Sequence, residues 1–174
     1  MRAAPVLFLD VDGVLNVPGD YAPGCALIRP VLAARLQRVL DATGADVVVS
    51  SAWRYQVLMG ATTLRGFQHM LRSHGIAAKV IDTTGRDPGD TQQDYTGATG
   101  GDERARQINA WLAAHPEVTR WAVVDDSDVD VGPRLVRTAG ARGLQDAEAD
   151  ALIVRLREGI AEQGEHRCTF ECPS

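Results

Sequence analysis

The sequence has few cysteines and no long hydrophobic segment. Its three cysteines, Cys25, Cys168 and Cys172, cannot build a disulfide framework, and their odd number is typical of a reducing compartment. His166 lies close to the last two, but a fourth ligand for a structural zinc site is missing, which disfavours zinc there. The apolar run near the N-terminus is much shorter than a secretory signal or a membrane span. We therefore expect a cytoplasmic protein without a membrane partner.

Positive charge is not in excess either. The formal net charge is −5, so contact with a polyanion would need a local basic patch, for which Arg54, Arg65, Arg72 and Lys79 are the candidates. The chain is 45% hydrophobic and 24% charged over 174 residues, which is typical of one compact domain with a buried core. We expect a single domain over residues 1–160 and a C-terminal tail over 161–174.

Apolar segments alternate between strand and helix patterns along the chain. Short β-branched or apolar runs predict strands over 6–9, 47–49, 79–82, 121–124 and 135–136. Apolar residues at helical spacing predict helices over 28–40, over 64–71, from a cap at Asp102 to before Pro116, and from about Gln145. Residues 83–101 are polar and glycine-rich and are expected to form a long surface loop. Together these elements predict an α/β fold with a mostly parallel sheet covered by helices on both faces.

Polar pairs follow three of the predicted strands. Ligand sites in parallel sheets form at the carboxyl ends of the strands, so these pairs are expected to meet at one edge. Each pair alone is also compatible with a plain turn or a solvated acidic loop, and their shared position is what favours a site. The pairs are Asp10 and Asp12, Ser50 and Ser51, and Asp125 and Asp126.

Two carboxylates two residues apart repel each other unless a cation separates them. Magnesium prefers carboxylate oxygens, so Asp10, the backbone carbonyl of Asp12 and one of Asp125 or Asp126 are candidate Mg²⁺ ligands. A carboxylate held in line with phosphorus is a competent nucleophile, and a second carboxylic acid can protonate the departing oxygen. We assign the first role to Asp10 and the second to Asp12.

A transferred phosphoryl group needs hydrogen-bond donors and a cation. Gly13 permits a tight turn that brings backbone N–H groups toward phosphate oxygens. The Ser50 hydroxyl and the Arg104 guanidinium are the other candidates for phosphate binding.

The segments that carry these residues resemble the motifs of the haloacid dehalogenase (HAD) superfamily of phosphatases. Residues 7–16 match its first motif, an apolar strand followed by Asp-x-Asp-Gly, residues 47–50 resemble the second, and residues 123–126 resemble the acidic fourth. The third motif is the weakest, and Arg104 fits it better than Lys79 does. The stretches 50–54 and 108–112 are similar to small phosphatase domains of RNA-repair proteins.

The resemblance covers residues 5–158 and implies a Rossmann-like three-layer α/β/α domain. It also implies a phospho-aspartyl intermediate on Asp10, acid–base work by Asp12, and Mg²⁺. Neither gap that holds a cap in this superfamily is long enough for a cap domain, so an open site flanked by residues 21–26 and 83–101 is expected. Such a site admits a phosphorylated small molecule, a nucleotide or a nucleic-acid end.

Three hypotheses stay open at this point. The first is a phosphomonoester hydrolase, the second a noncatalytic phosphate-binding module that keeps the fold, and the third a phosphotransferase. Trp53, Arg54 and Tyr95 are candidates for contact with a nucleic-acid substrate. The sequence contains no signal for an oligomeric state.

Overall fold

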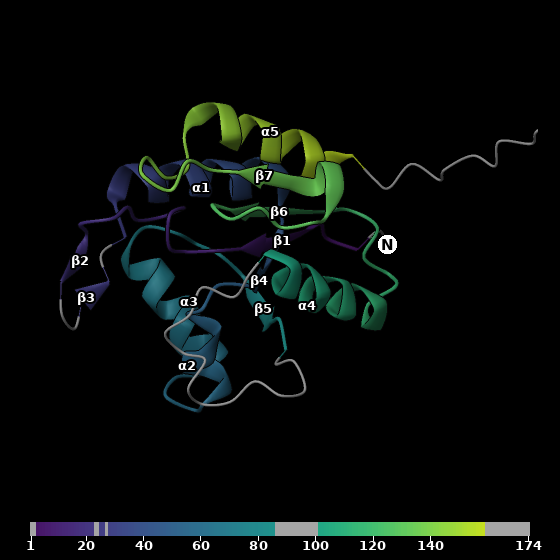
Figure 1. Ribbon diagram of the computed structural model, residues 1–174, viewed down its shortest axis with the longest axis horizontal. Helices are drawn as coiled ribbons and strands as arrows, with labels where there is room; N and C mark the ends of the chain where they lie inside the picture. The colour runs from purple at the N-terminus through teal and green to yellow at the C-terminus, as the bar shows by residue number, and fades with distance from the viewer. Residues whose placement is uncertain (1–2, 23–24, 27, 86–100, 159–174) are drawn as a thin grey trace, which may run out of the picture.

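A computed structural model describes residues 3–22, 25, 26, 28–85 and 101–158. Its centre is a sheet of five strands, all parallel, in the order β5-β4-β1-β6-β7 (Figure 1). The parallel sheet predicted from the sequence is therefore confirmed. In chain order the strands are β1 (Val6–Leu9), β4 (Asp46–Val49), β5 (Val80–Thr83), β6 (Trp121–Asp125) and β7 (Leu135–Arg137).

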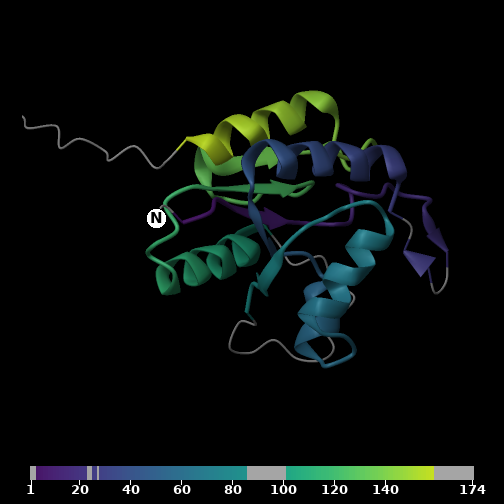
Figure 2. The same ribbon diagram turned by 180° about the vertical axis from the view of Figure 1, so that it is seen from behind.

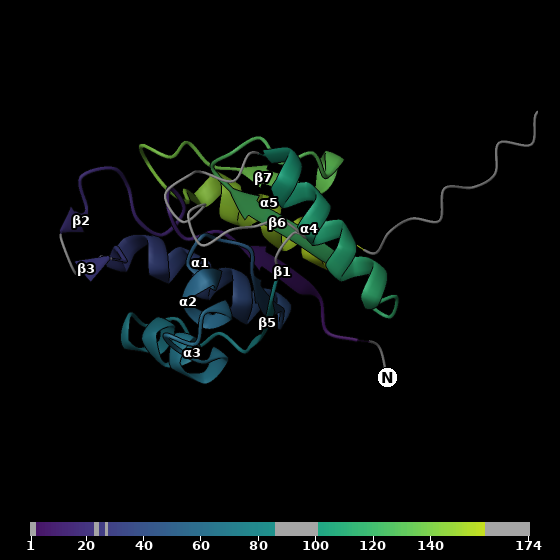
Figure 3. The same ribbon diagram turned by 60° about the horizontal axis from the view of Figure 1, so that its bottom comes forward.

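Helices cover both faces of this sheet, which gives the expected three-layer α/β/α arrangement. α1 (Pro30–Thr43), α3 (Leu64–Ser73) and α5 (Asp146–Arg157) pack on one face, and α4 (Gly101–Ala114) packs on the other. Figures 1 and 2 show α1 and α5 side by side on the face that is turned away from α4. The short helix α2 (Arg54–Leu58) lies next to α3 (Figure 3).

β1 is buried on both of its faces, which explains why its sequence is apolar throughout rather than alternating. Leu7 and Leu9 belong to the larger hydrophobic core beneath α1, α3 and α5. Phe8 points to the opposite core, where its ring meets Trp111 and Trp121 edge to face at centroid distances of 5.4 Å and 6.0 Å. The first strand therefore anchors both layers and holds the segment that follows it in one position.

Several elements differ from the sequence expectation. Tyr21–Ala22 (β2) and Cys25–Ala26 (β3) form a two-stranded antiparallel hairpin where a loop was expected. α2 and a 3₁₀ turn, η2 (Gly132–Arg134), were also not predicted. These elements are too short to show a hydrophobic period. α4 begins at Gly101, so Asp102 lies inside the helix instead of preceding it as a cap.

Other expectations fall on residues that the structure does not describe: most of the 83–101 loop, Tyr95, and the tail with His166, Cys168 and Cys172. In the described segments, the loop after β1 carries only the β2–β3 hairpin and no cap domain. Within the same segments, no helix is long and apolar enough to cross a membrane.

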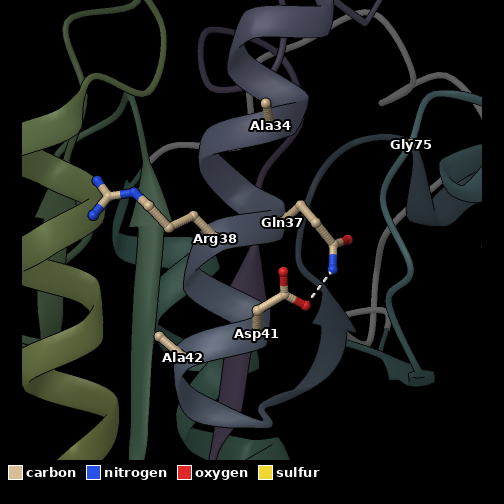
Figure 4. A pocket seen from close by; sticks show the side chains of 6 residues that line it. All are labelled: Ala34, Gln37, Arg38, Asp41, Ala42 and Gly75. Carbon is tan, nitrogen blue, oxygen red and sulfur yellow. Dashed lines mark hydrogen bonds between the residues drawn. The ribbon is translucent and has the colours of Figure 1, made fainter.

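A pocket of about 560 Å³ lies on the outer side of α1, where the turn before β5 approaches it (Figure 4). Gln37 donates to Asp41 at 2.7 Å, and Arg38 pairs with Asp150 at 2.5 Å, so these polar groups already bond within the protein. None of the residues that line the pocket follows the carboxyl end of a strand. They are Ala34, Gln37, Arg38, Asp41, Ala42 and Gly75.

Candidate active site

One residue from each of four adjacent strand ends lies in a single row at the carboxyl edge of the sheet. The parallel register continues past the ends of the strands. The N–H of Asp10 donates to Val124 O, that of Ser50 to Leu9 O, and that of Thr84 to Val49 O, each at 3.0 Å. Residues paired across parallel strands point to the same face. The row therefore reads Thr84, Ser50, Asp10, Asp125 on the face that α4 covers.

Arg104 connects α4 to the acidic part of this row. Its Nη1 lies 3.1 Å from Asp10 Oδ2 and also forms a hydrogen bond with Asp125 Oδ2. All three side chains are buried. Burial, opposed by the attraction of Arg104 and helped by the charge of the nearby Asp125, raises the pKa of Asp10 to about 7. Burial lowers the pKa of Arg104, but the two carboxylates outweigh that effect and raise it above its usual range.

Asp126 completes an acidic cluster with Asp10 and Asp125. Each of the three offers an oxygen that lies within 4.8 Å of the others. Burial and the charge of Asp125 raise the pKa of the Asp126 carboxyl as well. Three carboxylates against the single charge of Arg104 leave an excess of negative charge in a partly buried space. A divalent cation would compensate it.

Gly13 lets the loop after β1 approach this cluster closely. Its φ of +74° belongs to the left-handed region, and a Cβ at this position would overlap the Asp126 carboxylate. A Cβ on Gly140 would also come too close to this carboxylate, at 2.6 Å from Asp126 Oδ2. Thr138 donates to Gly13 O at 2.8 Å and ties the loop to the end of β7. The Gly13 N–H donates to Asn16 Oδ1 at 3.0 Å, within the loop.

Asp12 lies apart from the acidic cluster, although it is only two residues from Asp10. Its Oδ1 accepts a hydrogen bond from Asn16 Nδ2 at 2.8 Å, and its Oδ2 accepts one from Trp53 Nε1 at 3.0 Å. Both donors are neutral. The two motif carboxylates therefore occupy different environments, one beside a buried arginine and one between an amide and an indole.

Two buried hydroxyls of this row, Ser50 Oγ and Thr84 Oγ1, have no hydrogen-bond partner among the described residues, and neither has the buried Gln107 Oε1 on α4. Burying such a group without a partner costs free energy, which favours a ligand or water there. Ser50 was expected to bind phosphate, whereas Thr84 and Gln107 were not singled out. Thr84 could have been found in the sequence, because Thr83 and Thr84 follow the predicted strand 79–82 as Ser50 and Ser51 follow the predicted strand 47–49.

The comparisons with known proteins identify the family. Residues 6–149 match the family model described as "HAD domain in Swiss Army Knife RNA repair proteins". The chain belongs to this family. Its fold is that of a HAD-superfamily phosphatase domain. No curated protein and no solved structure matches the chain significantly.

The two candidates for the phosphate-binding cation of this HAD domain lie at opposite ends of the sheet. Lys79 pairs with Asp46 at 2.8 Å at the start of β4, whereas Arg104 lies among the acidic residues at the carboxyl edge. Of the two, Arg104 is the one that lies at the edge where the sequence places the phosphate site, and its contact with phosphate stays a prediction.

Arg54 of the HAD domain is fully buried, although it was a candidate for substrate contact. Its Nη1 donates to the carbonyl oxygens of Ser50 at 3.3 Å and Ser51 at 3.1 Å, and its Nη2 donates to the Tyr55 hydroxyl at 3.2 Å. These bonds hold the turn after β4, so the geometry favours a structural role for Arg54. The sequence could not show this, because an arginine after a strand is usually exposed.

Proposed function

We propose that this HAD domain is a magnesium-dependent phosphomonoester hydrolase that works through a phospho-aspartyl intermediate on Asp10. The observation that carries the proposal is the separation of the two motif carboxylates. Asp10 lies in the acidic cluster next to Arg104, whose positive charge would stabilise an anionic phosphoryl group bound there. Asp12 is held by neutral donors, where it can give and take a proton.

In the first half-reaction a carboxylate oxygen of Asp10 attacks phosphorus, and the bond between phosphorus and the departing alcohol oxygen breaks. Asp12 donates its proton to that oxygen. In the second half-reaction Asp12 takes a proton from water, which attacks the phosphorus of the acyl phosphate and releases inorganic phosphate and the Asp10 carboxylate. Arg104 and the Ser50 hydroxyl offset the charge of the phosphoryl oxygens during both steps.

The acidic cluster fits the magnesium ion that the family implies. Its ligands would be Asp10, the carbonyl of Asp12, and one of Asp125 or Asp126, which are the hard oxygen donors that Mg²⁺ prefers. When bound, the ion supplies the positive charge that lets a carboxylate and a phosphate approach each other.

We further propose a phosphorylated nucleic-acid end as the substrate and the cytoplasm as the place of action. The family description names RNA repair proteins, which supports a polynucleotide. The absence of a cap domain from the described residues supports a site that a macromolecule can enter. A nucleotide or another small phosphoester remains the alternative that the experiment must separate.

The test is a panel of 5′- and 3′-phosphorylated oligonucleotides, nucleotides, sugar phosphates and phosphopeptides with Mg²⁺. We expect Asp10→Asn to lose all turnover. Asp12→Asn should bind substrate but turn over poorly, and with an aryl phosphate it should accumulate an acid-stable phosphoenzyme. Asp128→Asn is the matched control, because this neighbouring carboxylate is exposed.

Activity that persists in Asp10→Asn would refute the nucleophile assignment. Phosphate binding without hydrolysis of any panel member would favour a noncatalytic binding module. Transfer of the phosphoryl group to an added alcohol in preference to water would identify a phosphotransferase.

A further inference from the structure

The carboxylate of Asp12 is held from two separate segments of the chain. Asn16 belongs to the same loop after β1, but Trp53 follows β4 and reaches Asp12 across the carboxyl edge of the sheet. We infer that Trp53 is a positioning residue, which sets the orientation of the Asp12 carboxylate for proton transfer to the leaving group. The inference rests on the function proposed above.

Trp53 is itself fixed on both sides. Its backbone N–H donates to Ser51 Oγ at 3.2 Å, which ties it to the turn after β4. Its ring meets the Phe67 ring of α3 edge to face, with 6.3 Å between centroids and 84° between planes. An indole held in this way cannot rotate without losing an aromatic contact, so its N–H presents a fixed donor to Asp12.

Both donors to Asp12 are uncharged, so they orient its carboxylate without forming an ion pair with it. The indole N–H is a donor only, and each carboxylate oxygen has a second lone pair that stays available for a proton. The contact therefore restricts the carboxylate without neutralising it, in contrast to the ion pair that Arg104 makes with Asp10.

The discriminating variant is Trp53→Phe, which removes the indole N–H but keeps an aromatic ring that can pack against Phe67. General-acid assistance matters most for a poor leaving group, such as an alkoxide, and little for nitrophenolate. We expect the single-turnover rate of phosphoenzyme formation to fall roughly tenfold with an alkyl phosphate. The rate with p-nitrophenyl phosphate should change much less, and KM should be unchanged for both.

Trp111→Phe is the matched control. Trp111 also donates its indole N–H to a carboxylate, Asp82, at 2.7 Å, and also meets a phenylalanine edge to face. It lies on α4 and has no contact with the motif aspartates among the described interactions. This variant should leave the ratio of the two rates as in the wild type.

A second measurement does not depend on activity. The chain has three tryptophans, so the indole N–H signals in a nitrogen–proton correlation spectrum can be assigned by substitution. Asp12→Ala should shift the Trp53 signal and spare that of Trp111, and Asp82→Ala should do the reverse.

Equal losses on both esters, or a change confined to KM, would show that Trp53 acts through packing or substrate contact and would overturn the inference. So would a Trp53 signal that Asp12→Ala leaves in place. If the wild type hydrolyses neither ester, the proposed function fails, and the spectrum alone then decides whether Trp53 holds Asp12.

Discussion

The affinity for Mg²⁺ should depend strongly on pH between 6 and 8. Burial raises the pKa of Asp10 to about 7, helped by the charge of Asp125 and opposed by Arg104. A carboxyl group must lose its proton before it can bind the metal. With a pKa of about 7, Asp10 is ionised to about 9% at pH 6 and about 91% at pH 8, so the apparent dissociation constant should fall roughly tenfold.

The raised pKa of Asp10 also predicts how the stability of the metal-free protein depends on pH. The folded pKa of Asp10 lies above the value of 3.8 for an unperturbed aspartate. The native state therefore binds more protons than the unfolded state between about pH 4 and pH 7. The contribution of Asp10 to stability is largest at the acid end of that window and is lost as the pH rises through about 7. Added Mg²⁺ should restore stability at the upper end.

The assay is a titration with Mg²⁺ by calorimetry at pH 6, 7 and 8 in buffers of constant ionic strength. Asp10→Asn is the internal control, because it removes the titrating group. In this variant the dissociation constant of Mg²⁺ should depend much less on pH. Dissociation constants that agree within about twofold at pH 6 and pH 8 would refute the reasoning, since they would mean that Asp10 is already ionised at pH 6.

Three further variants probe the same site. Arg104→Met leaves two buried carboxylates without their cation, so the free energy of unfolding in urea with EDTA should fall by about 3 kcal/mol, and an unchanged midpoint would contradict the pairing. Ser50→Ala removes a buried hydroxyl that has no described partner. It should therefore leave stability equal or raise it by about 1 kcal/mol while weakening inhibition by inorganic phosphate. Gly13→Ala should lower the free energy of unfolding by more than the roughly 1–2 kcal/mol that an alanine in the left-handed conformation costs, because its Cβ would overlap the acidic cluster. The same overlap should weaken Mg²⁺ binding. Gly60→Ala has the same φ of +74° and open space around it, so it should cost only the backbone strain, measured by the same urea titration.

Much of the fold could be predicted from the sequence because its strands and longer helices bury continuous or periodic apolar faces. The run 6–9 is apolar at every position because β1 lies between two cores. A glycine just after an apolar helical pattern is a typical helix end, and Gly44, with a φ of +64° and its N–H bonded to Leu40 O, ends α1 in this way. Short elements such as α2 and the β2–β3 hairpin have no such period, so the pattern could not reveal them.

The sequence by itself determined which residues arrive at the carboxyl edge, because each polar pair directly follows a buried strand of fixed direction. That placed Asp10, Ser50 and Asp125 together, as the register of the sheet shows. Only the tertiary structure decided what each residue meets. Trp53 and Arg54 are neighbours in sequence, yet one reaches Asp12 and the other is buried against the turn after β4. The difference arises because side-chain contacts depend on how separate segments pack in space, which a linear pattern of apolar and polar residues does not record.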